Sequence, residues 1–241
     1  MNNSNQTFFQ RDVFIDVIKA EAAKDKNVIF MSADFGAPAL DSLRDDLPDQ
    51  FFHCGISEQH MIDMAAGLSL SGKKVYVYAM SPFISLRCIE QIKCSLALMD
   101  LPVTVVSVGP GLGYADAGPT HYSTEDIACY RSLVGIEVIS PADQISTQKA
   151  AIMTLNNPKL RVVRLERNAL PNIVDKDTFD INQGFHTLKQ GSNVCILSSG
   201  YLLQRALSVS ENSNESIGVI DLFRIKEIPS SLMSELGSYK H

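Results

Sequence analysis

The sequence has no hydrophobic run of membrane-spanning length, and its longest apolar runs are only as long as strands. Its first ten residues are polar and lack the basic and apolar regions of a signal peptide. The net charge is −6, and the lysines and arginines are scattered rather than gathered into a basic stripe. We therefore expect neither a membrane-spanning protein, nor a secreted one, nor one that binds nucleic acid.

Cysteine is scarce as well. The five cysteines are an odd number without close pairing, and no Cys-x-x-Cys spacing typical of a metal site is present. We therefore expect reduced thiols, a cytoplasmic location and no metal ligands in this chain. The overall composition is that of an ordinary globular protein. Its 241 residues, 45% of them hydrophobic, suffice for a normal core in one large or two modest domains.

Short apolar runs alternate with segments of helical periodicity through residues 12–165. The apolar runs lie at 28–31, 75–79, 103–108, 136–139 and 160–165, and the helical segments at 12–24, 57–71, 83–99, 124–133 and 141–155. The last helix is expected to hold Pro141 at a tolerated early position. This alternation predicts an α/β fold with a parallel sheet covered on both faces. Such sheets bind ligands at the carboxyl ends of their strands, so the loops after Met31, Met80 and Val108 should form the ligand wall.

A smaller unit follows a stretch without periodicity. We interpret residues 168–190 as a linker between a first domain at 1–167 and a second unit at 191–241. The second unit is predicted to hold strands at 194–198 and 217–221 around a helix at about 201–211. Two strands and their helices bury a sheet poorly, so we interpret this unit as a partial C-terminal domain.

The most informative segment surrounds Glu58. This carboxylate should begin a helix directly after the glycine turn at Gly55, and the next turns, including Met64-Ala65-Ala66-Gly67-Leu68, are small and apolar. Such a helix is expected to be buried, and a buried acid is costly unless a partner uses it. We predict that Glu58 is a catalytic acid that acts on a cofactor. Taken alone, a glutamate at a helix N-terminus can also be favoured simply by the helix dipole.

Five motifs follow one another in the order and spacing of one enzyme family. They are Gly55-Ile56-Ser57-Glu58-Gln59-His60, Ser81-Pro82-Phe83, Gly118-Pro119-Thr120-His121, Ser140-Pro141-Ala142-Asp143 and Arg164-Leu165-Glu166-Arg167. Each is weak alone. Together they make residues 52–167 resemble the pyrimidine-binding domain of transketolase-like thiamine diphosphate enzymes. The C-terminal unit resembles the start of that family's third domain.

The resemblance implies a role for each of four residues. Glu58 would bond N1′ of the cofactor's aminopyrimidine and favour the imino tautomer, which removes the thiazolium C2 proton; the carbanion chemistry is the cofactor's own. Phe83 matches the aromatic that packs against the pyrimidine ring. His121 matches a histidine that faces the substrate, and Arg167 matches an arginine that contacts its phosphate. The residues alone also leave open a surface ion pair between Arg167 and Glu166 or a nearby Asp.

The sequence departs from ordinary transketolases around its Gly/Pro-rich loop at 109–118. Those enzymes carry Glu-Asp before Gly-Pro-Thr-His, whereas this chain has Asp116-Ala117. Gly109 stands where the family has a phosphate-contacting histidine. These departures put the usual sugar phosphates in doubt and suggest an atypical sugar acceptor.

One family motif is missing. No Gly-Asp-Gly followed by an Asn about one helix later, on which the family's diphosphate and metal site depends, occurs in this chain. The resemblance therefore implies the C-terminal subunit of a split transketolase. The binding site for thiamine diphosphate and Mg²⁺ would be completed by an N-terminal subunit. The assembly would be a homodimer or a two-plus-two heterotetramer. The chain alone should bind the cofactor weakly or not at all.

The reaction that the resemblance implies is transfer of a two-carbon ketol unit between sugars. Two alternatives remain open. One is a subunit that decarboxylates a 2-oxo acid, as a dehydrogenase beta subunit or a deoxyxylulose phosphate synthase-like enzyme does. The other is a non-catalytic binding or regulatory subunit of the same fold.

Overall fold

The larger part of the molecule is a six-stranded parallel sheet. The computed structural model describes residues 6–33 and 36–241, and the strand order is β3-β2-β4-β5-β7-β6. The strands are β2 (Val28–Ala33), β3 (Phe51–Gly55), β4 (Lys74–Met80), β5 (Val103–Val108), β6 (Glu137–Ile139) and β7 (Arg161–Leu165). The predicted α/β fold with a parallel sheet is confirmed.

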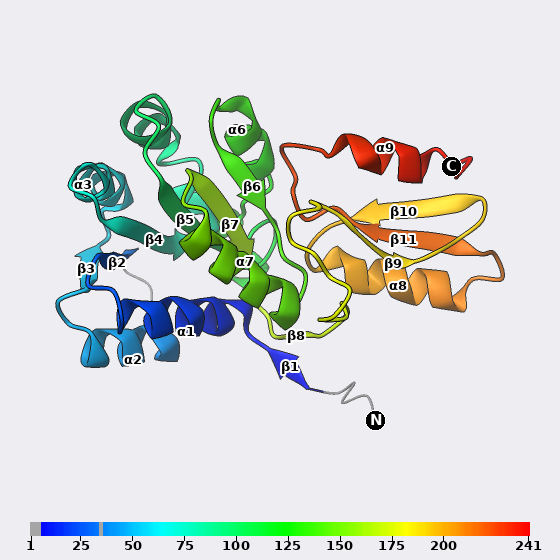
Figure 1. Ribbon diagram of the computed structural model, residues 1–241, viewed down its shortest axis with the longest axis horizontal. Helices are drawn as coiled ribbons and strands as arrows, with labels where there is room; N and C mark the ends of the chain where they lie inside the picture. The colour runs from blue at the N-terminus through cyan, green and yellow to red at the C-terminus, as the bar shows by residue number, and fades with distance from the viewer. Residues whose placement is uncertain (1–5, 34–35) are drawn as a thin grey trace.

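Helices cover both faces of this sheet (Figure 1). One layer holds α1 (Gln10–Ala22), α2 (Pro38–Asp46) and α7 (Gln144–Asn156), and the other holds α3 (Glu58–Leu70), α5 (Ile89–Gln91), the π-helix η1 (Ile92–Ala97) and α6 (Asp126–Ser132). Successive strand residues face opposite layers: Val75 and Val77 pack with α3, whereas Tyr76 and Tyr78 pack with α1. Burial on both faces explains why β5 is apolar almost throughout.

The helix predicted at 83–99 is broken. It consists of α4 (Ser81–Ile84), a turn, and then α5 and the π-helix η1. The Ser85 hydroxyl donates to the carbonyl of Ser81 at 2.6 Å, a local bond that competes with regular helix geometry. The turn places Arg87 outside any helix, which matters for the site described below. Short π-helical segments are frequent at functional sites.

Helix α7 begins later than predicted. Asp143 is its N-cap, because Asp143 Oδ1 accepts from the Ser146 N–H at 2.8 Å while Ser146 Oγ accepts from the Asp143 N–H at 3.0 Å. Pro141 therefore lies before the helix, and the prediction that it occupies the first turn was wrong. The second oxygen of Asp143 accepts from the N–H groups of residues 173 and 174 at 2.8 and 2.9 Å. This cap thus also anchors the stretch that was interpreted as a linker.

A second sheet holds three strands in the order β10-β11-β9. They are β9 (His186–Lys189), β10 (Val194–Ser198) and β11 (Ile217–Asp221), with α8 (Leu202–Asn212) on one side and α9 (Ser230–Leu236) on the other (Figure 1). The strands at 194–198 and 217–221 have the predicted bounds. Strand β9 and helix α9 were not predicted, and β9 runs antiparallel to β11. The sheet therefore has one strand more than the periodicity indicated.

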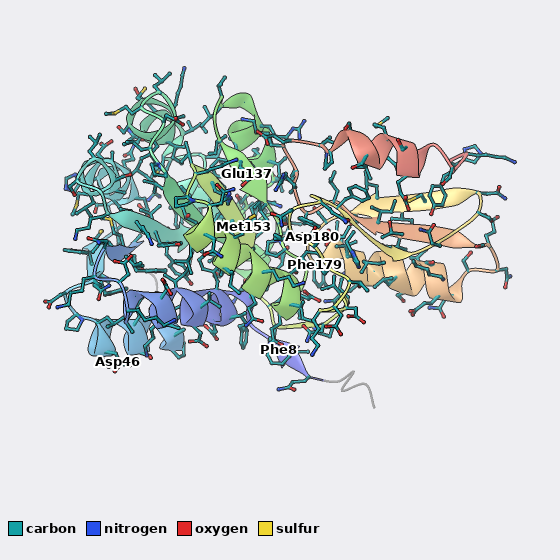
Figure 2. The ribbon with its side chains drawn as sticks, in the orientation of Figure 1. Phe8, Asp46, Glu137, Met153, Phe179 and Asp180 are labelled. Atoms are coloured by element: carbon teal, nitrogen blue, oxygen red, sulfur yellow. The ribbon has the colours of Figure 1, made fainter. Side chains whose placement is uncertain are left out.

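The stretch 168–190 is packed between the two sheets. It contains β8 (Leu170–Pro171), paired with β1 (Thr7–Phe8), as well as β9. Phe179 lies in an apolar cluster with Met153 of α7 and Phe223, and Figure 2 shows Met153 and Phe179 in the middle of the molecule. The segment after β11 also pairs with the large sheet, since the Ser140 N–H donates to the Phe223 carbonyl at 2.8 Å. No helix within the described ranges is long and apolar enough to cross a membrane.

Candidate functional site

The residues singled out by their motifs gather at the carboxyl ends of the parallel strands. Ser81 follows β4, Gly109 follows β5, and Glu166 follows β7. Glu58 begins α3 shortly after β3. Because all six strands run in parallel, these loops share one edge of the sheet, the edge where such folds bind ligands.

Glu58 is a buried carboxylate at the first position of α3. Its exposed fraction is 5%, and Arg87 Nη1 donates to its Oε2 at 2.7 Å. Within residues 6–33 and 36–241, the other oxygen, Oε1, has no hydrogen-bond donor. Although the side chain as a whole is buried, Oε1 is not one of the fully enclosed unpartnered atoms among the described residues, so a ligand can reach it. It therefore suits a ligand atom that can share a proton with a carboxylate oxygen.

Arg87 joins Glu58 to the other candidate residues. Its guanidinium carbon lies 4.5 Å above the centre of the Phe83 ring. The Phe83 ring meets the His121 ring edge-to-face, with 5.2 Å between centroids and 72° between planes. The structure thus brings Glu58, Phe83 and His121 into one contiguous cluster. Sequence reasoning missed Arg87; the available signal was a charged residue four positions after Phe83 in the predicted helix at 83–99.

His121 ends a short turn in the loop between β5 and α6. The turn η3 (Pro119–His121) follows Gly118, whose φ of +86° favours glycine. The His121 N–H donates to the Gly118 carbonyl at 2.9 Å, and its Nδ1 lies 3.0 Å from the Thr120 hydroxyl. The ring is half-buried, and among the described residues its Nε2 has no hydrogen-bond partner. Such an imidazole can hold or move a proton.

Arg167 lies apart from this cluster and is already paired. It donates to both carboxylate oxygens of Asp116, with 3.1 Å between Nη2 and Oδ2, and its guanidinium carbon lies 4.5 Å over the Tyr114 ring. The structure therefore pairs Arg167 with Asp116 rather than with Glu166, while contact with a substrate phosphate stays a prediction. Hydrogen bonds from Arg167 lower the pKa of Asp116.

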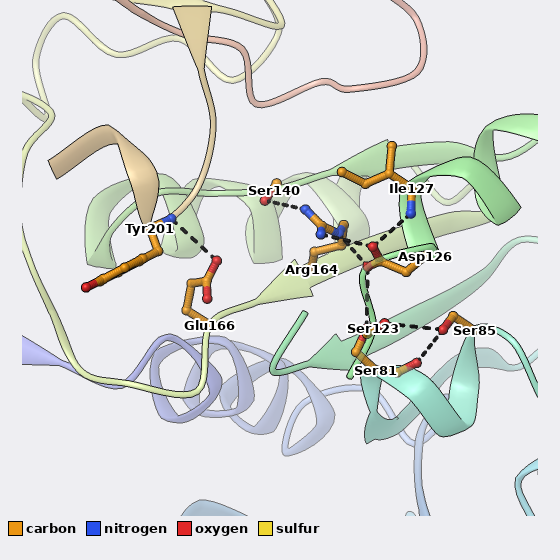
Figure 3. Close-up of polar contacts among 9 residues, drawn as sticks. All are labelled: Ser81, Ser85, Ser123, Asp126, Ile127, Ser140, Arg164, Glu166 and Tyr201. Atoms are coloured by element: carbon orange, nitrogen blue, oxygen red, sulfur yellow. Dashed lines mark hydrogen bonds and ion pairs between the residues drawn. The ribbon is translucent and has the colours of Figure 1, made fainter. Parts of the chain in front are cut away.

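A network of polar side chains holds the loops together (Figure 3). At its centre, the buried Arg164 donates to both oxygens of Asp126, at 2.7 and 3.1 Å. Ser81 Oγ lies 2.7 Å from the hydroxyl of Ser123, and Ser140 Oγ accepts from Arg164 at 3.2 Å. The network therefore links the ends of β4, β6 and β7 to the start of α6. It therefore holds in place the loops that carry Phe83 and His121.

A cavity of about 490 Å³ lies beside this network, between the loop at 110–113, the end of β7 and the start of α8. Glu166 and Arg205 are among its lining residues, whereas Glu58, Phe83 and His121 are not. Burial raises the pKa of Glu166, and its Oε1 accepts from the Tyr201 N–H at 3.4 Å (Figure 3). The cavity is thus distinct from the cluster around Glu58.

The structure explains why residue 109 is a glycine. Its φ is +73°, and a Cβ there would lie 2.1 Å from Cε2 of the Tyr114 ring. That ring is in turn held by Arg167. Any side chain at position 109, including the histidine that the resemblance implies, would displace Tyr114.

We therefore expect Gly109→Ala to destabilise the protein by about 1–3 kcal/mol, because overpacking adds to backbone strain. Urea unfolding monitored by circular dichroism measures the effect. Gly111→Ala is the matched control, since Gly111 has a φ of +62° but nothing within 4 Å of the position that an added methyl group would take. Equal losses of stability in the two variants would show that the Tyr114 contact contributes nothing.

Comparison with known proteins identifies a family and two relatives. The family described as transketolase, pyrimidine binding domain, matches residues 8–172. An apulose-4-phosphate transketolase subunit of Phocaeicola vulgatus is 32% identical over 231 residues, which cover 93% of this chain and 74% of that protein. The 6-deoxy-6-sulfo-D-fructose transketolase subunit SqwH of Clostridium sp. is 28% identical over 221 residues, covering 90% of this chain and 68% of that protein.

A solved structure gives the same fold. A split gene transketolase, described as an inactive beta4 tetramer, superposes with a TM-score of 0.84 over 97% of this chain and 78% of that chain, at 24% identity. This similarity covers both sheets. The fold predicted for the first domain is thereby confirmed.

Proposed function

The chain belongs to the transketolase pyrimidine-binding domain family, and we propose that it is the C-terminal subunit of a split, thiamine diphosphate-dependent enzyme that transfers a two-carbon ketol unit between sugars. The observation that carries the proposal is Glu58, a buried carboxylate with one oxygen lacking a donor, in a cluster with Phe83 and His121. The names of the two relatives, each a transketolase subunit, support a divided enzyme.

Each residue of the cluster has a proposed task. Glu58 would hold the aminopyrimidine through N1′, using the oxygen that Arg87 leaves open. Phe83 would exclude water from one face of the ring. When bound, thiamine diphosphate supplies a carbon nucleophile and an electron sink. His121 would bond a substrate hydroxyl and hold or release its proton, while Arg167 would lie toward the distal end of the sugar.

The rest of the site would come from a second polypeptide. We propose an N-terminal subunit that binds the diphosphate and Mg²⁺, and an assembly that is either a homodimer or a two-plus-two heterotetramer of the two kinds of chain. We also propose the division into a first domain at 1–167, a connection at 168–190 and a partial C-terminal domain at 191–241. The cytoplasmic location expected from the sequence stays a prediction.

Reconstitution tests the proposal directly. The chain is mixed with a candidate diphosphate-binding subunit, and ketol transfer from a ketose to an aldose is measured with and without thiamine diphosphate and Mg²⁺. We expect activity only in the complete mixture, because neither chain alone would hold both ends of the cofactor. Calorimetry of the single chain should accordingly show weak or no cofactor binding.

Two outcomes would contradict this proposal. Consumption of pyruvate without cleavage of a ketose would favour the decarboxylation of a 2-oxo acid instead. A complex that forms and binds cofactor, yet turns over neither class of substrate, would favour a non-catalytic subunit.

A further inference from the structure

The guanidinium of Arg167 is occupied by the chain's own groups. Its Nη1 and Nη2 donate to the two oxygens of Asp116 in the paired geometry that arginine also adopts with phosphate. Nη1 in addition donates to the Gly113 carbonyl at 3.3 Å, and the Tyr114 ring covers one face. Asp116 therefore takes the place that a phosphate would need.

In the loop at 109–123, the negative charge of Asp116 is balanced by Arg167 without a ligand. Asp116 is the only Asp, Glu, Lys or Arg between residues 109 and 123. Arg167 lowers the pKa of Asp116, so this carboxyl is ionised at neutral pH and the pair has no net charge. A phosphate would have to displace Asp116 from Arg167 and then lie close to a second negative charge, which repels it.

Position 109 supplies no compensating cation. Its φ of +73° and the Tyr114 ring against it exclude any side chain. Tyr114 is held against Gly109 on one side and against Arg167 on the other. The same Tyr114 ring therefore requires glycine at position 109 and covers the guanidinium of Arg167, which donates to Asp116.

Resting on the ketol transfer proposed above, we infer that the sugar end reaching this loop is uncharged and that Asp116 is the residue that selects against a phosphate there. A hydroxyl-bearing end can accept from Arg167 and donate to Asp116 without separating them. A phosphate can only accept from Arg167, in competition with Asp116. The substrate class that fits is a ketose or aldose with an unphosphorylated distal end.

The first test does not depend on enzyme activity. Inorganic phosphate is titrated into the full-length chain and followed by NMR, comparing the wild type with Asp116→Asn, whose side chain is 67% exposed and whose replacement should not disturb folding. We expect phosphate binding to tighten about tenfold in Asp116→Asn and to be lost again when Arg167→Met is added. Asp45→Asn, which removes an exposed charge elsewhere, is the control.

Binding of phosphate to the wild type as tightly as to Asp116→Asn would overturn the inference. An equal gain in Asp45→Asn would do the same, since the effect would then reflect net charge alone.

The second test uses the reconstituted complex with fructose and fructose 6-phosphate as a matched pair. We expect Asp116→Asn to raise kcat/KM for fructose 6-phosphate about tenfold relative to fructose. A wild type that already favours the phosphorylated sugar, with a ratio unchanged in Asp116→Asn, would contradict the role of Asp116. If the complex turns over neither this pair nor any other ketose while the phosphate titration behaves as expected, ketol transfer is refuted and the exclusion of phosphate by Asp116 stands.

Discussion

Replacing Glu58 with Gln should lower ketol transfer by the reconstituted complex by about a hundredfold or more, the range in which a positioned acid or base contributes. Glutamine keeps the size of the side chain and one acceptor oxygen but cannot share a proton with the aminopyrimidine. Its effect on folding should be small, because Arg87, the ion-pair partner of Glu58, is 41% exposed and can turn to water. The loss should therefore fall on catalysis rather than on assembly.

The measurements are kcat/KM in the reconstituted complex, the dissociation constant of thiamine diphosphate by calorimetry and the thermal midpoint of the chain. Glu90→Gln is the matched control, because Glu90 is an exposed glutamate in the same helical layer. We expect the control to match the wild type in all three. Undiminished activity of Glu58→Gln would show that Glu58 does not act on the cofactor, even if the complex is an active transketolase.

The sequence predicts the parallel sheet well because its strands are buried on both faces. Strand β5 has the predicted bounds. Its run of β-branched residues is typical of a strand in the middle of a sheet that is covered on both faces. Helix α2 and strand β3 were missed; β3 has only five residues, and its burial does not alternate, since the adjacent Phe52 and His53 are both exposed. Strand β9 was missed for another reason: it depends on pairing with β11, about thirty residues away.

Prediction of the site has the same limit. The motifs place Glu58, Phe83 and His121 at loop positions that the parallel sheet then brings together. The partners of these residues are not encoded locally. Arg87 contacts Glu58 from 29 positions away, and Asp116 contacts Arg167 from 51 positions away. Such contacts depend on how loops from different strands meet, which periodicity does not describe.

The buried ion pair between Arg161 and Glu137 gives the largest expected effect on the free energy of unfolding. Arg161 is fully buried and donates from Nε to Glu137, its neighbour across the β6–β7 register. Glu137, labelled within the sheet layer in Figure 2, also lies 3.3 Å from Nε of Arg224. Removing its charge leaves the Arg161 guanidinium buried without compensation. We expect Glu137→Gln to cost about 3–5 kcal/mol of unfolding free energy.

Urea unfolding of the chain measures this cost, and a surface pair supplies the control. Arg44 and Asp41 lie 3.0 Å apart with side chains 53% and 59% exposed, so Arg44→Ala should cost less than about 1 kcal/mol. The double variant Glu137→Met/Arg161→Met should lose less than Glu137→Gln, because no fully buried charge is then left unpaired; Arg224, the other partner of Glu137, is 21% exposed and can reach water. If Glu137→Gln costs no more than Arg44→Ala, water or backbone groups must solvate Arg161 in the variant, and the charge of Glu137 is not what holds β6 against β7.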